Sequence, residues 1–170
     1  VLQGPGLDAG LEMLAWIRRE FGLPVLTDVH RCEDVAAVAE VVDVIQIPAF
    51  LCQQTTLIVA AGKTGKPVNV KKGQFLSPEG MFSSVGKLER TGNQRILLTE
   101  RGASFGYNNL VADMTAIPIM QELGYPVIFD AGHQVRRYGI SSEHPSGGRS
   151  RELIPVLLRA AIAAGTNGIF

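Results

Sequence analysis

The sequence predicts an α/β fold in which the strands form a parallel sheet, and three observations support this prediction. Helical and strand patterns alternate strictly along all 170 residues, as expected for right-handed β–α–β units. Apolar strands end in polar groups that begin at Lys71, Glu100 and Asp130. Polar tips at the carboxyl ends of buried strands are typical of an α/β enzyme, whose site lies at that end of the sheet.

Two architectures could contain such a sheet. A doubly wound sheet would be expected to carry a glycine-rich phosphate loop, but neither Gly-x-Gly-x-x-Gly nor Gly-x-x-x-x-Gly-Lys occurs. A (β/α)8 TIM barrel spreads its site over many strand ends, which is the pattern found here. We therefore predict one domain, residues 1–170, that is an incomplete barrel segment lacking the first two strands and the last helix. Its open sheet edges should make it unstable or prone to aggregate by itself.

The elements follow from local patterns, taken in order. The first helix, 7–21, is predicted from apolar residues at Leu7, Leu11, Leu14 and Ile17, with Gly22 as its stop. The elements expected next are a strand at 25–30, a helix at 33–42, a strand at 44–48, a helix at 55–61 and a strand at 68–70.

The second half begins with a helix whose start is marked by Ser77 as the cap and Pro78 in the first turn. This helix should run to about Arg90. The elements expected beyond it are a strand at 96–98, a polar loop at 104–109, a helix at 110–123, a strand at 127–129, a long loop at 134–149, a helix at 150–164 and a strand at 168–170.

Composition excludes several classes of partner. The 16 basic and 16 acidic residues balance, which argues against a nucleic-acid surface. Cys32 and Cys52 form no Cys-x-x-Cys pair, so we interpret both as buried thiols in a reducing cytoplasm. No apolar run approaches the roughly 20 residues that span a bilayer, and no secretory leader pattern opens the chain. We therefore expect a cytoplasmic protein with no membrane partner.

Polar side chains should gather at one mouth of the barrel, because parallel strands align their carboxyl ends. Side chains alternate in direction along a strand, so Lys71 and Lys72 cannot both point into the mouth; one should turn outward or pair with an acid. Lys71 and Arg101 suit a phosphate or carboxylate, although ordinary ion pairs are the alternative. The expected members are Asp28, His30, Gln46, Lys71, Lys72, Gln74, Glu100, Arg101, Asp130 and His133.

Several of these residues admit two interpretations. Asp28 could orient a hydroxylated substrate or cap the helix that follows it. His133 could be a metal ligand, a proton carrier or simply a hydrogen-bonded side chain, whereas His30 and His144 are interpreted as structural. The last long loop could be a lid over an anion or a surface connection; its residues of interest are Arg136, Arg137 and Ser146-Gly147-Gly148-Arg149.

Longer blocks carry a family resemblance. They are Ile-Gln-Ile-Pro-Ala-Phe-Leu at 45–51, Asn-Val-Lys-Lys-Gly-Gln-Phe at 69–75 and Thr-Glu-Arg-Gly-Ala-Ser-Phe-Gly-Tyr-Asn-Asn-Leu-Val at 99–111, with 27–30 and 129–133 fitting as well. The sequence resembles the 3-deoxy-D-manno-octulosonate 8-phosphate synthases over essentially its whole length. The 3-deoxy-D-arabino-heptulosonate 7-phosphate synthases share some of these themes but lack Pro-Ala-Phe and Phe-Gly-Tyr-Asn-Asn, so they rank second.

The resemblance implies a condensation of phosphoenolpyruvate with D-arabinose 5-phosphate and water, which yields the eight-carbon phosphosugar acid and phosphate for lipopolysaccharide synthesis. It also implies roles by matched position. Asp28, Lys71 and His133 would be catalytic, with Asp28 on the pentose hydroxyls and His133 near the reacting carbons. Lys71 and Arg101 would hold the phosphate of phosphoenolpyruvate, with Gln74 beside them; Pro48, Ala49 and Phe50 would line that pocket.

The resemblance departs from the family pattern at Gln53. Family members carry there an arginine that reaches a neighbouring subunit's pentose-phosphate site, within an expected homotetramer. The family also divides into metal-dependent and metal-independent classes, and only His133 of the metal-ligand set falls within this sequence. We expect a divalent metal in the full-length protein. A barrel fragment that binds phosphoenolpyruvate without catalysis is a further alternative.

Overall fold

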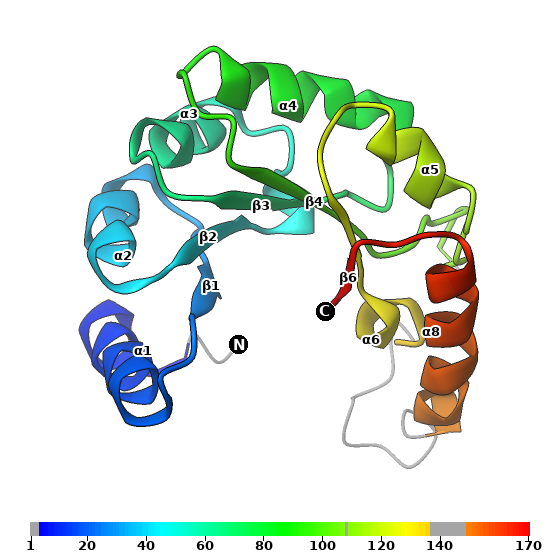
Figure 1. The fold of residues 1–170 in the computed structure, drawn as a ribbon, viewed down its shortest axis with the longest axis horizontal. Coiled ribbons are helices and arrows are strands. Elements are labelled where there is room, and N and C mark those ends of the chain that lie inside the picture. The colour runs from blue at the N-terminus through cyan, green and yellow to red at the C-terminus, as the bar shows by residue number, and fades with distance from the viewer. Residues whose placement is uncertain (1–3, 108, 137–148) are drawn as a thin grey trace.

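The computed structural model describes residues 4–107, 109–136 and 149–170. Within this part of the chain, six strands form one parallel sheet in strict chain order. The sheet curls into an open half-barrel with the helices on its convex side (Figure 1). The strands are β1 (Leu26–Asp28), β2 (Val44–Ile47), β3 (Val68–Lys71), β4 (Ile96–Glu100), β5 (Val127–Phe129) and β6 (Gly168–Ile169).

Helices connect consecutive strands, and short 3-10 turns precede several of them. The α-helices are α1 (Leu7–Phe21), α2 (Val35–Val41), α3 (Thr55–Lys63), α4 (Phe82–Glu89), α5 (Ala116–Gln121), α6 (Ala131–Gln134) and α8 (Ile154–Ala163). The 3-10 turns are η1 (Cys32–Asp34), η2 (Ala49–Leu51), η3 (Glu79–Met81) and η4 (Arg149–Leu153).

The strand order confirms the barrel prediction over the doubly wound alternative. A doubly wound sheet reverses its strand order at a switch point, whereas here each strand pairs with the next one along the chain. Sequential parallel pairing with consistent curvature is the geometry of a (β/α)8 barrel. The described chain therefore forms an α/β half-barrel of the TIM-barrel type.

The two faces of the sheet differ in chemistry. The face toward the helices is apolar, and its side chains are almost fully buried: Ile45, Ile47, Val68, Val70, Ile96, Leu98, Val127 and Phe129. The concave face is polar, because Gln46 pairs in register with Asn69, and Lys71 pairs with Thr99. Neighbours in register on parallel strands share a face, so these polar residues lie together inside the half-barrel.

The predicted helix at 110–123 is wrong at its beginning, because α5 starts only at Ala116. Val111 instead forms an antiparallel bridge with Ala103, with both N–H···O bonds at 2.9–3.0 Å. Asp113 then accepts hydrogen bonds from the backbone and side chain of Thr115 and closes a turn. These local partners compete with helical bonds, so the helix starts after them.

The long loop predicted at 134–149 falls largely on residues 137–148, which lie outside the described residues. Arg137, His144 and Ser146-Gly147-Gly148 belong to that stretch. The structure adds helix α6, which was not expected, directly before it. The interpretation of both cysteines as buried is wrong for Cys32, which is exposed at the start of η1, and right for Cys52.

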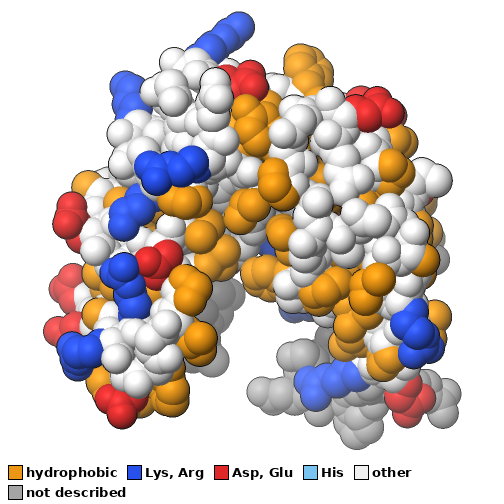
Figure 2. Space-filling model, in the orientation of Figure 1, with side chains coloured by type: hydrophobic (Ala, Val, Ile, Leu, Met, Phe, Trp, Pro, Cys, Tyr) orange, Lys and Arg blue, Asp and Glu red, His pale blue; other side chains and the backbone are white. Residues whose placement is uncertain are grey.

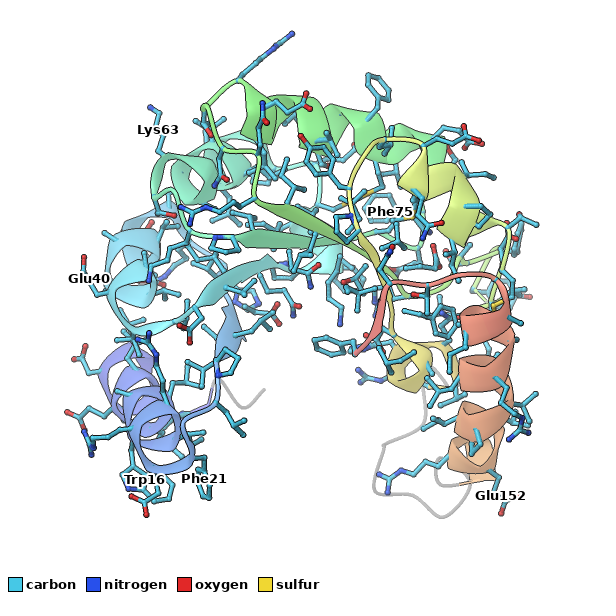
Figure 3. The ribbon with its side chains drawn as sticks, viewed as in Figure 1. Trp16, Phe21, Glu40, Lys63, Phe75 and Glu152 are labelled. Carbon is cyan, nitrogen blue, oxygen red and sulfur yellow. The ribbon has the colours of Figure 1, made fainter. Side chains whose placement is uncertain are left out.

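Apolar side chains remain exposed at both flanks of the half-barrel. Trp16 and Phe21 lie on the surface of α1, in edge-to-face contact with centroids 5.8 Å apart (Figure 3). Val156 and Ile162 of α8 are also more than half exposed. Figure 2 shows hydrophobic side chains on either side of the hollow between these flanks. In the described part of the chain, no helix combines the length and apolar character needed to cross a membrane.

Candidate active site

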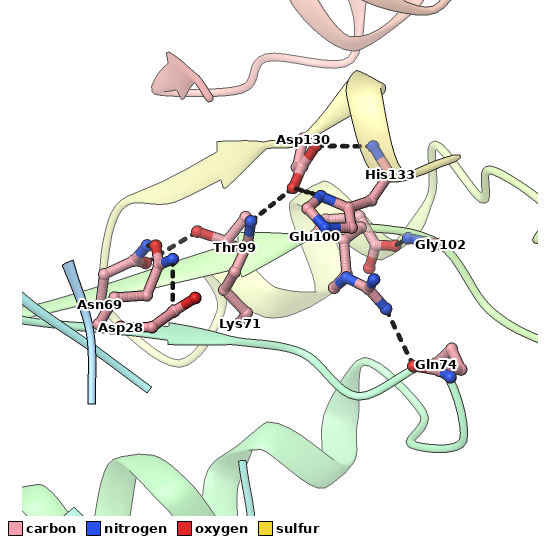
Figure 4. A network of polar contacts seen from close by, with 11 residues as sticks. Asp28, Asn69, Lys71, Gln74, Thr99, Glu100, Gly102, Asp130 and His133 are labelled. Atoms are coloured by element: carbon pink, nitrogen blue, oxygen red, sulfur yellow. Dashed lines mark hydrogen bonds and ion pairs between the residues drawn. The ribbon is translucent and has the colours of Figure 1, made fainter. Parts of the chain in front are cut away.

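The carboxyl ends of the strands bring together most of the side chains expected at the barrel mouth. Figure 4 shows Asp28, Lys71, Gln74, Asp130 and His133 in one region of polar contacts on the concave side. They come from β1, the end of β3, the loop after β3, and the β5–α6 junction. Basic, acidic and amide side chains that are far apart in the sequence therefore lie together at one end of the sheet, and their role in binding a ligand stays a prediction.

Asp130 joins Lys71 and His133. Its Oδ2 lies 2.5 Å from Lys71 Nζ and 2.6 Å from His133 Nδ1, and its Oδ1 accepts from the His133 backbone N–H. Lys71 and Asp130 are both buried, whereas 38% of the His133 side chain is exposed. Burial alone would raise the pKa of Asp130, but the hydrogen bonds from His133 and Lys71 lower it to about 2.

The contact to Asp130 also orients the imidazole. With Nδ1 engaged by a carboxylate, Nε2 is the ring nitrogen that remains for a ligand. Lys71 Nζ additionally lies 3.5 Å from the centroid of the Phe170 ring. Asp130 was expected at this rim, but its role as the partner of both Lys71 and His133 could not be read from the sequence.

Arg101 is buried without a counter-charge. It is only 5% exposed, and its Nη1 donates to Gln74 Oε1 at 2.9 Å. Among the residues that the structure describes, no carboxylate forms an ion pair with it. A guanidinium has five donors, so most of its hydrogen-bonding capacity is left for a ligand.

Lys72 and Glu100 lie on the opposite, helix-facing side. Lys72 Nζ is 3.4 Å from Glu100 Oε2 and also donates to the carbonyls of Leu76 and Gly102. Burial raises the pKa of Glu100, although the neighbouring Lys72 opposes this. The expectation that one of the paired lysines turns away and meets an acid is confirmed.

Gly102 makes the turn after β4 possible. Its φ is +96°, which favours glycine, and its N–H donates to Glu100 Oε1 at 2.5 Å. An added Cβ would also lie 3.2 Å from the Leu110 Cβ. This turn holds Arg101 at the rim.

Asp28 does not cap the following turn, so that interpretation is wrong. The cap position of η1 is Arg31 and has no side-chain cap bond, while Asp28 accepts from Gln46 Nε2 at 2.8 Å. Gln46 connects further to Asn69, and Asn69 to Thr99. Neither Asn69 nor Thr99 was predicted to belong to the site. The sequence did contain a signal for them. Asn69 lies two residues before Lys71 and Thr99 two residues before Arg101, so each lies on the same face of the sheet as the cation that follows it.

The segment after β2 forms η2 at the same end of the sheet. Pro48 is half-buried, Ala49 is buried and Phe50 is 65% exposed. Gln53 is exposed, and its carbonyl accepts from Lys87 Nζ at 2.8 Å. Among the residues that the structure describes, no hydrogen bond or ion pair joins this segment to Arg101, so its part in the pocket stays a prediction.

Metal ligands are sparse in the described residues. They contain no cluster of three or more histidine, cysteine, aspartate or glutamate side chains suited to a metal ion. His133 nevertheless has the arrangement common to metal-binding histidines, in which one ring nitrogen meets a carboxylate and the other is left for the ion.

The fold and rim define an α/β-barrel protein with a candidate anion-binding active site at the carboxyl ends of its strands. The sequence profile of the DAHP synthetase I family matches residues 2–170. The chain belongs to this family.

Curated relatives carry a more specific name. The chain is 57% identical over 168 residues to the 2-dehydro-3-deoxyphosphooctonate aldolase of Trichlorobacter lovleyi, covering 99% of this chain and 61% of the relative. It is 58% identical to the protein of that name from Acidithiobacillus ferrooxidans, covering 99% and 59%. For the Nitratidesulfovibrio vulgaris protein of that name, identity is 60%, with coverage of 99% and 61%. The chain thus spans about three fifths of the length of these relatives.

Proposed function

We propose that this chain provides a large part of a 3-deoxy-D-manno-octulosonate 8-phosphate synthase. The reaction would join phosphoenolpyruvate, D-arabinose 5-phosphate and water to form the eight-carbon phosphosugar acid and inorganic phosphate, for lipopolysaccharide synthesis. The names of the relatives support this substrate pair over that of the heptulosonate phosphate synthases.

The observation that carries the proposal is the buried, uncompensated Arg101. Burying a charge without an opposite charge is costly, so such a residue indicates an anionic ligand. The phosphate of phosphoenolpyruvate matches a guanidinium that has free donors. Lys71 donates one hydrogen bond to Asp130, and its ammonium group has further donors for the phosphate of phosphoenolpyruvate. Cations already fixed in place need little reorganisation as charge moves during carbon–oxygen cleavage.

The other roles follow from position at the same rim. Asp28 is exposed and would accept hydrogen bonds from the pentose hydroxyls. His133 would face the reacting carbons with Nε2, while Asp130 holds Nδ1. Pro48, Ala49 and Phe50 would line the phosphoenolpyruvate pocket.

A divalent metal remains a proposal in which His133 Nε2 supplies one ligand and the remaining ligands come from outside this chain. When bound, such an ion would polarise an oxygen of a substrate or of water. We also propose that the half-barrel belongs to a closed (β/α)8 barrel, with the missing strands pairing at the edges of β1 and β6. A homotetramer and a cytoplasmic location stay predictions, which sedimentation and cell fractionation would check.

The proposal is tested with Arg101→Ala in a version of the protein that carries the complete barrel. We expect kcat/KM for phosphoenolpyruvate to fall by at least about 10²–10³-fold, as when a preorganised donor is removed. Without ligand, the variant should unfold at an equal or higher temperature, because an uncompensated buried charge is gone. Stabilisation by added phosphoenolpyruvate should disappear.

The matched control is Arg95→Ala. Arg95 precedes β4 at the opposite end of the strand and donates to the Gly65 carbonyl, so turnover should stay within about twofold of the unchanged protein. Near-normal catalysis by Arg101→Ala would refute the assignment. Turnover of erythrose 4-phosphate in place of arabinose 5-phosphate would favour a heptulosonate phosphate synthase. Binding heat with phosphoenolpyruvate but no product would indicate a non-catalytic barrel.

A further inference from the structure

A chain of polar side chains crosses four adjacent strands on the concave face. Thr99 Oγ1 donates to Asn69 Oδ1 at 2.8 Å, and Asn69 Nδ2 donates to Gln46 Oε1 at 2.8 Å. Gln46 Nε2 then donates to Asp28 Oδ1 at 2.8 Å. We call these four residues the polar ladder (Figure 4 labels Asp28, Asn69 and Thr99).

The carboxylate of Asp28, at the end of the polar ladder, determines which group donates and which accepts in every hydrogen bond of the ladder. An ionised carboxylate only accepts hydrogen bonds, so Gln46 must present its NH2 group to Asp28. Its carbonyl oxygen therefore faces Asn69, which must in turn donate with its own NH2 group. The oxygen of Asn69 is then left for Thr99, whose hydroxyl must donate. Every amide orientation is thus set from one end to the other.

Burial makes this arrangement rigid. Thr99 is 0%, Asn69 2% and Gln46 3% exposed, so a lost hydrogen bond could not be replaced by bulk water. Asp28 at the end is exposed, and its described contact uses Oδ1, which leaves Oδ2 available for a ligand. The polar ladder therefore holds the Asp28 carboxylate in one orientation, in which Oδ2 can bind a ligand.

The same residues are tied to the cationic part of the rim. Asn69 lies two residues before Lys71 on β3, and Thr99 pairs in register with Lys71. Thr99 also lies two residues before Arg101. The polar ladder consequently relates the position of Asp28 to that of the cations through the backbones of β3 and β4, which carry both sets of side chains.

We propose that Asn69 and Thr99 are positioning residues for the second substrate, acting through Gln46 on Asp28. They orient Asp28 Oδ2 toward a hydroxyl of the polyhydroxylated phosphosugar while phosphoenolpyruvate lies against Lys71 and Arg101. This inference rests on the proposed function, because it assigns the sugar to Asp28. The polar ladder sets the specificity for that sugar and contributes little to the binding of phosphoenolpyruvate.

The test is Thr99→Val in the protein with the complete barrel, since valine keeps the shape and removes only the donor. We expect KM for arabinose 5-phosphate to rise about five- to tenfold, the size of one lost hydrogen bond, with KM for phosphoenolpyruvate within about twofold. Thr99→Ser keeps the hydroxyl and should restore the unchanged KM. Thr91→Val, which removes a helix-end hydroxyl bonded to the Leu88 carbonyl, should have no effect on either KM.

A crystal structure of Thr99→Val provides a readout that does not depend on activity. We expect the Gln46–Asp28 contact to lengthen or the Asn69 amide to turn over. An unchanged KM for the sugar, or equal impairment in Thr99→Val and Thr99→Ser, overturns the inference. If the unsubstituted protein does not accept arabinose 5-phosphate, the proposed function fails. If Thr99→Val keeps full activity and an undisturbed polar ladder, only the positioning role is refuted.

Discussion

Asp130 is the residue on which the electrostatics of the rim depends. It is buried, it neutralises Lys71, and it orients His133 through the same oxygen. A carboxylate that serves two partners cannot be replaced by a neutral group without consequences for both. Lys71 would then be a buried cation without its carboxylate partner.

This arrangement predicts a specific sensitivity to acid. The pKa of Asp130 is lowered to about 2 from 3.8, so its ion pair stabilises the fold above about pH 4 and that stability is lost as pH falls through about 2. The contribution is on the order of 2 kcal/mol. Asp130→Asn should lower the stability at pH 7 and flatten its decline between pH 4 and 2, as measured by urea unfolding at several pH values. An equally steep decline in the variant would show that other carboxylates cause it.

At the scale of elements, β3 and β4 each finish with charged residues on both faces of the sheet. Lys71 meets Asp130 on the concave face, while Lys72 meets Glu100 on the helix face. Lys72 also donates to the carbonyls of Leu76 and Gly102, which follow β3 and β4 respectively. Lys72 therefore connects the loop that carries Gln74 to the turn that follows Arg101, on the helix-facing side of the sheet.

Breaking the helix-facing pair on one side should be costly. Lys72→Met leaves Glu100 buried without a cation and should destabilise the fold by about 3–5 kcal/mol. Combining Lys72→Met with Glu100→Gln should recover most of that loss, because no buried charge remains. Urea unfolding measures both, and Lys63→Met on the exposed surface of α3 serves as the control, with an effect below about 0.5 kcal/mol. A double variant as unstable as the single one would refute the pairing.

At the scale of the whole molecule, the half-barrel has unpaired strand edges. In the described chain, β1 and β6 are the outer strands of the sheet, and apolar side chains of α1 and α8 lie exposed beside them. An open parallel edge is a template for further pairing, by the rest of a barrel or by other chains.

The 170-residue chain alone should therefore self-associate through these edges. Ile169→Lys places a charge on the edge strand β6, where 46% of the isoleucine is exposed, and should reduce association in sedimentation experiments. Val156→Lys removes a similar exposed apolar group from α8 but leaves the edge unchanged, so it should have a smaller effect. Equal effects of the two substitutions would indicate association through general apolar contacts. In the complete barrel, neither substitution should change the state of association.

Much of this architecture could be predicted because the signals are local. The stripe of Leu11, Leu14 and Ile17 packs on the core as expected, and strands appear at the predicted places. The helix expected from Leu110 was wrong because Val111 found a backbone partner in Ala103, which no periodicity reveals. The alternation of Lys71 and Lys72 was predicted, since it follows from strand geometry alone.

The order of helices and strands, and the polar groups at the strand ends, could be read from the sequence because periodicity and turn residues act over short distances. Which of those groups contact one another became apparent only in the folded chain. Lys71 and Asp130 are 59 residues apart, and Thr99 and Asn69 are 30 apart. Such partnerships depend on the register and curl of the sheet, which arise from the packing of the whole chain and from no single segment of it.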